Sequence, residues 1–83
     1  DEDAVEIKRM YVPPTQRQKG IASLVLGELE RWAQQLGYQR CVLETGKKQP
    51  EAIALYTRRG YHLIPNYGQY VGVESSVCFE KRF

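Results

Sequence analysis

The chain has 83 residues, which suffices for one small domain but not for two, because a chain of this length buries only about 60% of its unfolded surface. Hydrophobic residues make up 42% and charged residues 27%, as in an ordinary globular protein, so disorder is not expected as the main state. The net charge of +2 is too small to favour a nucleic acid or a membrane surface as partner, and no apolar run approaches the roughly 20 residues that span a bilayer.

The first predicted element is a strand over residues 5–12, where β-forming residues alternate until Pro13-Pro14 ends the pattern. After a polar loop, the apolar residues recur from Gly20 at steps of three and four, which predicts a helix with Gly37 as its C-cap glycine. Trp32 belongs to the apolar stripe of this helix and is expected in the core. The stripe consists of Ile21, Leu24, Val25, Leu29, Trp32 and Leu36.

The second half of the chain predicts a strand over residues 41–45 and a helix that begins at Pro50 and is closed by Gly60. Two further strands, over residues 61–64 and 75–82, are joined by a loop rich in glycine and proline. The predicted order is β-α-β-α-β-β in an α/β fold with a mixed sheet. The first three strands are expected to form βαβ units and the last two an antiparallel hairpin, all in a single domain over residues 1–83.

The loop before the first helix is a candidate phosphate site, because a helix start presents unpaired N–H groups and the positive end of the helix dipole. Gly20 lets an anion approach the backbone closely. A Walker A loop and a dinucleotide fingerprint are both absent. The alternative is that Gly20 only begins the helix and binds no phosphate. The candidate residues are Arg17, Gln18, Lys19, Gly20, Ile21 and Ala22.

Two motifs resemble the GNAT N-acetyltransferase family. Arg17, Gly20 and Ala22 match its Arg/Gln-x-x-Gly-x-Gly/Ala hallmark, and the run from Gln49 to Tyr56, followed by Gly60-Tyr61, resembles its later Asn-x-x-Ala-x-x-Leu-Tyr…Gly-Phe pattern. The resemblance implies the C-terminal, coenzyme-binding part of the acyl-CoA N-acyltransferase fold. It also implies acetyl-CoA as cosubstrate, no metal, and acetyl transfer to a primary amine. The alternative is a non-catalytic acyl-CoA-binding or interaction module.

The resemblance also implies roles for single residues. Tyr56 matches the family's tyrosine, which protonates the leaving thiolate, and Gln49 stands where the family has an asparagine that contacts the coenzyme. The strand before the loop would pair through its backbone with the pantetheine arm of the coenzyme. In this chain that role falls on Met10, Tyr11 and Val12.

Two carboxylates are candidates for the base that deprotonates the amine. Glu44 is ranked first because it ends the second predicted strand, where some ribosomal-protein acetyltransferases of the family have an acid; Glu6 lies where histone-type members place theirs. Either can instead be a solvated residue or part of a salt bridge. Tyr67 and Tyr70 are expected either to line an acceptor site or only to cover the sheet, and His62 is interpreted as structural.

The family's domain opens with three strands and two helices that are not found before residue 5 here, so the domain is expected to be partial. A shortened form, a half-domain completed by a partner segment, or a piece of a larger protein all remain open. Because the edge of the first strand is exposed, the chain alone is expected to be either a homo-oligomer or poorly stable. Cys41 and Cys78 predict reduced thiols in a cytoplasmic protein. Amino acids, polyamines, aminoglycosides, protein N-termini and lysines are all open as acceptors.

Overall fold

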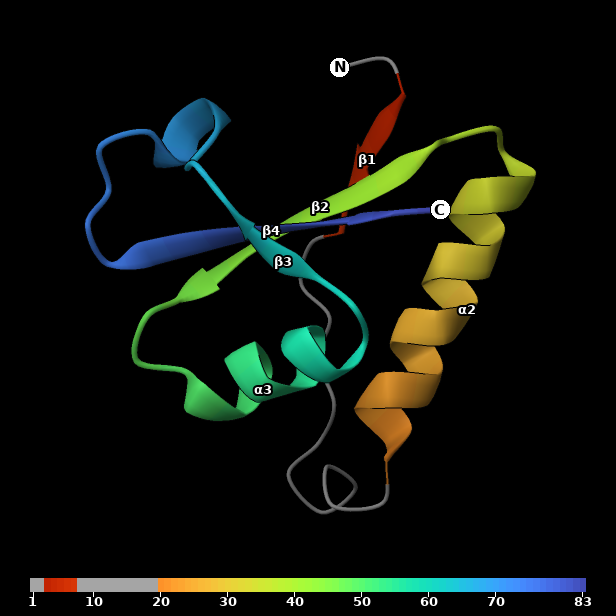
Figure 1. Ribbon diagram of the computed structural model, residues 1–83, viewed down its shortest axis with the longest axis horizontal. Helices are drawn as coiled ribbons and strands as arrows, with labels where there is room; N and C mark the ends of the chain where they lie inside the picture. The colour runs from red at the N-terminus through yellow and green to blue at the C-terminus, as the bar shows by residue number, and fades with distance from the viewer. Residues whose placement is uncertain (1–2, 8–19) are drawn as a thin grey trace.

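The computed structural model describes residues 3–7 and 20–83 (Figure 1). Its order of regular elements confirms the predicted β-α-β-α-β-β series, with one short 3₁₀ helix added before the last strand. Residues 8–12 of the first predicted strand and residues 17–19 of the phosphate loop lie outside the described residues. The elements are β1 (Ala4–Glu6), α2 (Ile21–Gln35), β2 (Arg40–Gly46), α3 (Pro50–Arg58), β3 (His62–Ile64), η1 (Gly68–Tyr70) and β4 (Ser76–Arg82).

The four described strands form one mixed sheet in the order β1-β2-β4-β3. β1 and β2 are parallel, whereas β4 is antiparallel to both of its neighbours, β2 and β3. The predicted mixed sheet and the predicted β3–β4 hairpin are therefore confirmed. β3 runs in the same direction as β2, as a βαβ unit requires, but the two do not pair because β4 lies between them.

The core lies between one face of the sheet and the two helices. Alternation along the strands brings Cys41 and Leu43 of β2 and Phe79 of β4 to this face. Ile53 and Tyr56 of α3 pack against the cluster as partly buried residues. The buried cluster consists of Leu26, Ala33, Cys41, Leu43, Tyr61 and Phe79.

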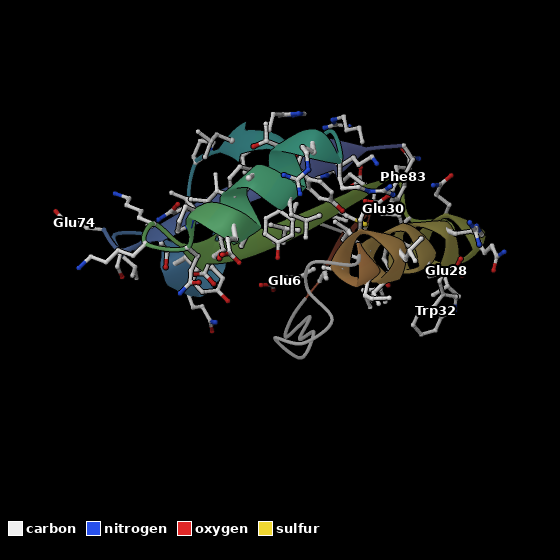
Figure 2. All side chains as sticks on the ribbon, turned by 90° about the horizontal axis from the view of Figure 1, so that it is seen from below. Glu6, Glu28, Glu30, Trp32, Glu74 and Phe83 are labelled. Carbon is white, nitrogen blue, oxygen red and sulfur yellow. The ribbon has the colours of Figure 1, made fainter. Side chains whose placement is uncertain are left out.

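The prediction that Trp32 lies in the core is wrong, because 60% of this residue is exposed. α2 instead buries Leu26, Glu30 and Ala33, so the helix is turned relative to its predicted stripe. Figure 2 shows Trp32 pointing away from the rest of the molecule. The outward face, here called the exposed apolar stripe, carries Leu24, Val25, Trp32 and Leu36.

A buried charge cluster explains why α2 turns this way. Glu30, with a side chain only 6% exposed, accepts hydrogen bonds from Tyr61 Oη at 2.9 Å, Lys81 Nζ at 3.0 Å and Arg59 Nη2 at 3.1 Å. A Cβ on Gly27 would lie 3.0 Å from Arg59 Nη2, so the glycine leaves room for the guanidinium to cross the helix. The Glu30 cluster thus joins α2 to the end of α3 and to β4.

Within residues 3–7 and 20–83, neither helix combines the length and the apolar character that crossing a bilayer requires.

Candidate functional site

A cavity of about 760 Å³ opens where the carboxyl ends of the parallel strands β1 and β2 meet the start of α2, one side of α3, and η1. It brings together residues that are far apart in the sequence. Six of the predicted site residues line it: Glu6, Gly20, Ala22, Glu44, Gln49 and Tyr56. Six others, Met10, Tyr11, Val12, Arg17, Gln18 and Lys19, lie outside the described residues, and Ile21 is not among the lining residues.

The start of α2 presents its backbone to this cavity. Gly20 has φ 74° and ψ 12°, the left-handed conformation that glycine adopts most easily, and no side chain caps the helix. The first bond of the helix runs from Leu24 N to Gly20 O at 3.1 Å. The amides of Ile21, Ala22 and Ser23 therefore precede the helix's own hydrogen-bond ladder and can bind an anion.

Tyr56 contributes an aromatic hydroxyl from α3. Its ring is tilted against those of Tyr61 and Phe79, with centroids 5.8 and 5.9 Å away, so the core fixes its position. Burial, and then the charge of Glu44, raise the pKa of Tyr56 above its ordinary value. The hydroxyl is consequently protonated at neutral pH and can donate a proton.

Gln49 precedes the first residue of α3. Its carbonyl accepts the helix's first bond, from Ile53 N at 3.1 Å, while its side chain does not cap the helix. Gln49 is one of the residues that line the cavity, and a glutamine amide can both donate and accept a hydrogen bond.

Both candidate carboxylates accept hydrogen bonds from hydroxyl groups. Ser76 Oγ donates to Glu44 Oε2 at 2.6 Å, and Tyr67 Oη and Tyr70 Oη donate to Glu6 Oε2 at 3.1 and 3.4 Å. Burial first, and then the charge and hydrogen bond of Glu6, raise the pKa of Tyr67, which keeps its hydroxyl a donor. Both tyrosines thus contact Glu6, and Tyr70 also lines the cavity.

Ser76 is a residue that the sequence analysis missed. It reaches Glu44 because β4 pairs with β2 in a register that places Gly46 opposite Ser76 and Glu44 opposite Cys78. No local motif marks such a contact, since it depends on the strand order of the folded sheet.

The two cysteines are both buried free thiols, as predicted. Burial, followed by the charge of Glu30, raises the pKa of Cys41 to about 11, so this thiol is unreactive at neutral pH. Among the residues that the structure describes, no three His, Cys, Asp or Glu side chains are grouped to hold a metal ion.

Comparison with known proteins gives a consistent set of relatives. Residues 1–61 match the sequence profile of the acetyltransferase (GNAT) family. An uncharacterized N-acetyltransferase, YjgM, from Escherichia coli K12 is 42% identical over 65 residues, which cover 77% of this chain but 38% of that protein.

Solved structures show the same likeness. A protein from Klebsiella pneumoniae, described as an acyl-CoA N-acyltransferase, superposes with a TM-score of 0.93 and 38% identity over 98% of this chain and 56% of its own. A GNAT family acetyltransferase from Elizabethkingia anophelis, solved with acetyl-CoA bound, superposes with a TM-score of 0.83 at 18% identity over 100% of this chain and 63% of its own. The chain spans about 40 to 60% of the length of these three proteins.

Proposed function

Because the chain belongs to the GNAT acetyltransferase family, we propose that it transfers an acetyl group from acetyl-CoA to a primary amine. The observation that carries this proposal is one cavity that is lined by the start of α2, by Tyr56 and by both candidate bases, Glu6 and Glu44. The Elizabethkingia relative binds acetyl-CoA with the same fold, which supports acetyl-CoA as the donor here.

The coenzyme's pyrophosphate would bind at the start of α2. The amides of Ile21, Ala22 and Ser23 supply N–H donors and the helix dipole supplies positive potential, as at other helix starts that bind phosphate. Arg17, Gln18 and Lys19 are proposed to complete this loop. The pantetheine arm would pair with the backbone of residues 10–12, and Gln49 would bond to the coenzyme from α3.

The chemistry is attack of the amine nitrogen on the thioester carbonyl carbon. With a pKa of about 10.4, an alkylamine needs about 4.6 kcal/mol to become neutral at pH 7, so a base is useful. Glu44 or Glu6 would accept the amine's proton, directly or through water. As the carbon–sulfur bond breaks, the sulfur would take a proton from the Tyr56 hydroxyl.

The acceptor is a small-molecule or peptide amine, and the active form is a homo-oligomer or is completed by a partner segment. We place the protein in the cytoplasm, because both of its cysteines are free thiols and such thiols persist in a reducing compartment.

Calorimetric titration with acetyl-CoA tests the coenzyme assignment. Gly20→Glu should abolish binding, because it forces a side chain into the left-handed conformation and adds an anion beside the phosphate site. Gly37→Glu is the matched control, since Gly37 also has positive φ, at 92°, with open space around it, but lies at the other end of α2.

The two variants separate strain from binding. Both should lose about 1–2 kcal/mol of folding stability, but only the Gly20 variant should lose acetyl-CoA affinity. Retained affinity in Gly20→Glu would refute the phosphate assignment. Binding of acetyl-CoA to the wild type without thiol release from any amine would favour the non-catalytic module instead.

A further inference from the structure

Ser76 begins β4 and is a buried serine whose side chain reaches the cavity wall. Its hydroxyl donates to Glu44 Oε2 at 2.6 Å, and 7% of the residue is exposed. A bond of this length from a hydroxyl to a carboxylate is typical of the stronger, charge-assisted kind. The two residues are diagonal neighbours on one face of the sheet, because Gly46 pairs with Ser76 and Glu44 with Cys78. Figure 1 shows the end of β2 beside the start of β4, where this contact forms.

Ser76 is itself held through its backbone on both sides. Its N–H donates to the Val73 carbonyl at 3.1 Å, and its own carbonyl accepts a hydrogen bond from Asn66 Nδ2 at 3.2 Å. The carbonyl of the neighbouring Ser75 accepts the Lys47 N–H at 2.8 Å, which ties the start of β4 to the loop after β2. The hydroxyl therefore projects from a fixed backbone, so the carboxylate that it binds is held in a fixed place.

Glu44 is bound through one of its two carboxylate oxygens. Within residues 3–7 and 20–83, Oε2 accepts the bond from Ser76 and no hydrogen-bond donor reaches Oε1. Glu44 lines the same cavity as Tyr56, the proposed proton donor, and burial and then the charge of Glu44 raise the pKa of that tyrosine. A carboxylate that is held through one oxygen keeps the other in a constant position, where it can accept a proton from a substrate.

Resting on the proposed acetyl transfer, we propose that Ser76 is a positioning residue that holds Glu44 as the base of the reaction. The ammonium group of the acceptor gives a proton to the second oxygen of Glu44, and the lone pair so released attacks the thioester carbon. When the carbon–sulfur bond breaks, the sulfur takes the Tyr56 proton, and the second proton of the nitrogen restores the Tyr56 hydroxyl. Ser76 exchanges no atom with the substrate, since it acts only through Glu44.

Thiol release from acetyl-CoA tests this role, measured on the whole protein in the oligomeric state in which it purifies. Spermidine, lysine and alanyl-alanine are offered as acceptors, and the variants are compared with the one that is acetylated fastest. Ser76→Ala should lower kcat about tenfold, because Glu44 loses a hydrogen bond to its charged form and with it a fixed position. The Kd for acetyl-CoA should stay the same. Ser76→Thr restores the hydroxyl and should keep most of the wild-type kcat.

A double-mutant cycle shows through which carboxylate Ser76 acts. In the Glu44→Gln background, Ser76→Ala should have little further effect on kcat, because the group that it positions is no longer a base. In the Glu6→Gln background, the full effect of Ser76→Ala should persist. Ser75→Ala is the matched control, because Ser75 is an exposed neighbour that is not among the residues lining the cavity. Its kcat should equal that of the wild type.

Urea denaturation of the same variants tests the contact without any turnover. Ser76→Ala and Glu44→Gln should be coupled in the free energy of unfolding, as residues that share a hydrogen bond are. Coupling in stability together with additive effects on kcat would make the contact purely structural and would overturn the positioning role. The absence of coupling in stability would overturn the contact itself.

The remaining outcomes separate this inference from the function on which it rests. A loss of kcat in Ser76→Ala that persists in Glu44→Gln but disappears in Glu6→Gln would overturn the assignment of Glu44 and leave acetyl transfer intact. No thiol release by the wild type with any of the three amines would overturn the proposed transfer, and the positioning role with it.

Discussion

Glu30 is a charged residue in the middle of α2 whose side chain is almost fully enclosed. Its carboxylate is stabilised only because Arg59, Lys81 and the Tyr61 hydroxyl surround it. A buried charge with good partners adds little net stability, but the loss of one partner leaves the others uncompensated. The cluster therefore makes α2 sensitive to substitution at a single position.

Glu30→Gln should lower the free energy of unfolding by about 3 kcal/mol, the lower end of the usual range because Arg59 and Lys81 are a quarter to a third exposed. Urea denaturation measures the change. Glu28→Gln is the control on the same helix, because the Glu28–Arg31 pair is about two-thirds exposed and should contribute less than about 1 kcal/mol. Equal effects of the two substitutions would contradict this account of Glu30.

Tyr56→Phe removes one hydroxyl from the cavity and keeps the ring that packs on Phe79. If this hydroxyl protonates the leaving sulfur, kcat should fall by about 100-fold while the Kd for acetyl-CoA stays the same. Thiol release at saturating amine measures kcat, with Tyr38→Phe as the control. A kcat within twofold of the wild type would remove Tyr56 from the mechanism.

The sequence predicts that residues of the two motifs lie at one site, but it does not predict all of their hydrogen-bond partners. Gly20, Gln49 and Tyr56 line one cavity as the two motifs suggested, because each motif fixes the start or the face of one helix. The hydroxyl donors Ser76 and Tyr67 could not be assigned to their carboxylates. Their contacts depend on strand register and on a loop conformation that no local pattern encodes.

β2 and β4 are the two inner strands of the sheet, and an ion pair links them. Arg40 Nη1 lies 2.6 Å from Glu80 Oε2, and the two side chains are 13% and 10% exposed. Burial alone would raise the pKa of Glu80. The hydrogen bond from Arg40 and the charges of Arg82, Arg40 and His62 outweigh burial, and they hold this pKa below its ordinary value of 4.5.

The sign of the pH effect follows from that lowered pKa. The unfolded chain takes up the proton at a higher pH than the folded one, so Glu80 stabilises the fold above pH 4.5 and this contribution is lost as the pH falls through the folded pKa. Glu80→Gln should lower the free energy of unfolding by about 1–3 kcal/mol at pH 7. The acid limb, which is the fall of this free energy as the pH is lowered, should become less steep.

Urea midpoints between pH 7 and pH 3 check this prediction. Glu74→Gln is the control, because Glu74 lies in an exposed part of the loop before β4 and should leave the acid limb as steep as in the wild type. An acid limb that stays unchanged in Glu80→Gln would assign the pH dependence to other carboxylates.

The boundaries of the two helices were predictable from the sequence, whereas the buried face of α2 was not. Gly37, with φ 92°, lies just beyond the end of α2, and Pro50 begins α3, because glycine and proline act through their own backbone conformation. The buried face depends on partners from distant segments. Those partners bury Glu30, and the apolar Trp32 is turned outward.

At the scale of the molecule, the exposed apolar stripe of α2 is a surface that a partner could cover. Its four residues are between 38% and 66% exposed, and large apolar patches on a small protein promote association. β1 also forms one edge of the described sheet. The chain alone is therefore expected to associate or to unfold readily.

The fluorescence of Trp32 reports whether the exposed apolar stripe is covered by association, since Trp32 is the only tryptophan in the sequence. Its fluorescence should be strongly quenched by iodide in dilute protein, and the quenching should weaken as the concentration rises and the stripe becomes covered. Light scattering should show the mass increasing over the same range. Leu24→Lys should keep the protein smaller and the quenching strong; a monomer at all concentrations would contradict the prediction.

The position of β4 in the sheet has a consequence for how the protein is made. The last strand to be synthesised among those described is an inner one, and β3 joins the sheet only through it. A nascent chain that still has residues 76–82 inside the ribosome can pair β1 with β2 but cannot attach β3. Attachment of β3 must therefore wait until residues 76–82 have been synthesised, and until then the earlier elements expose surface that can aggregate.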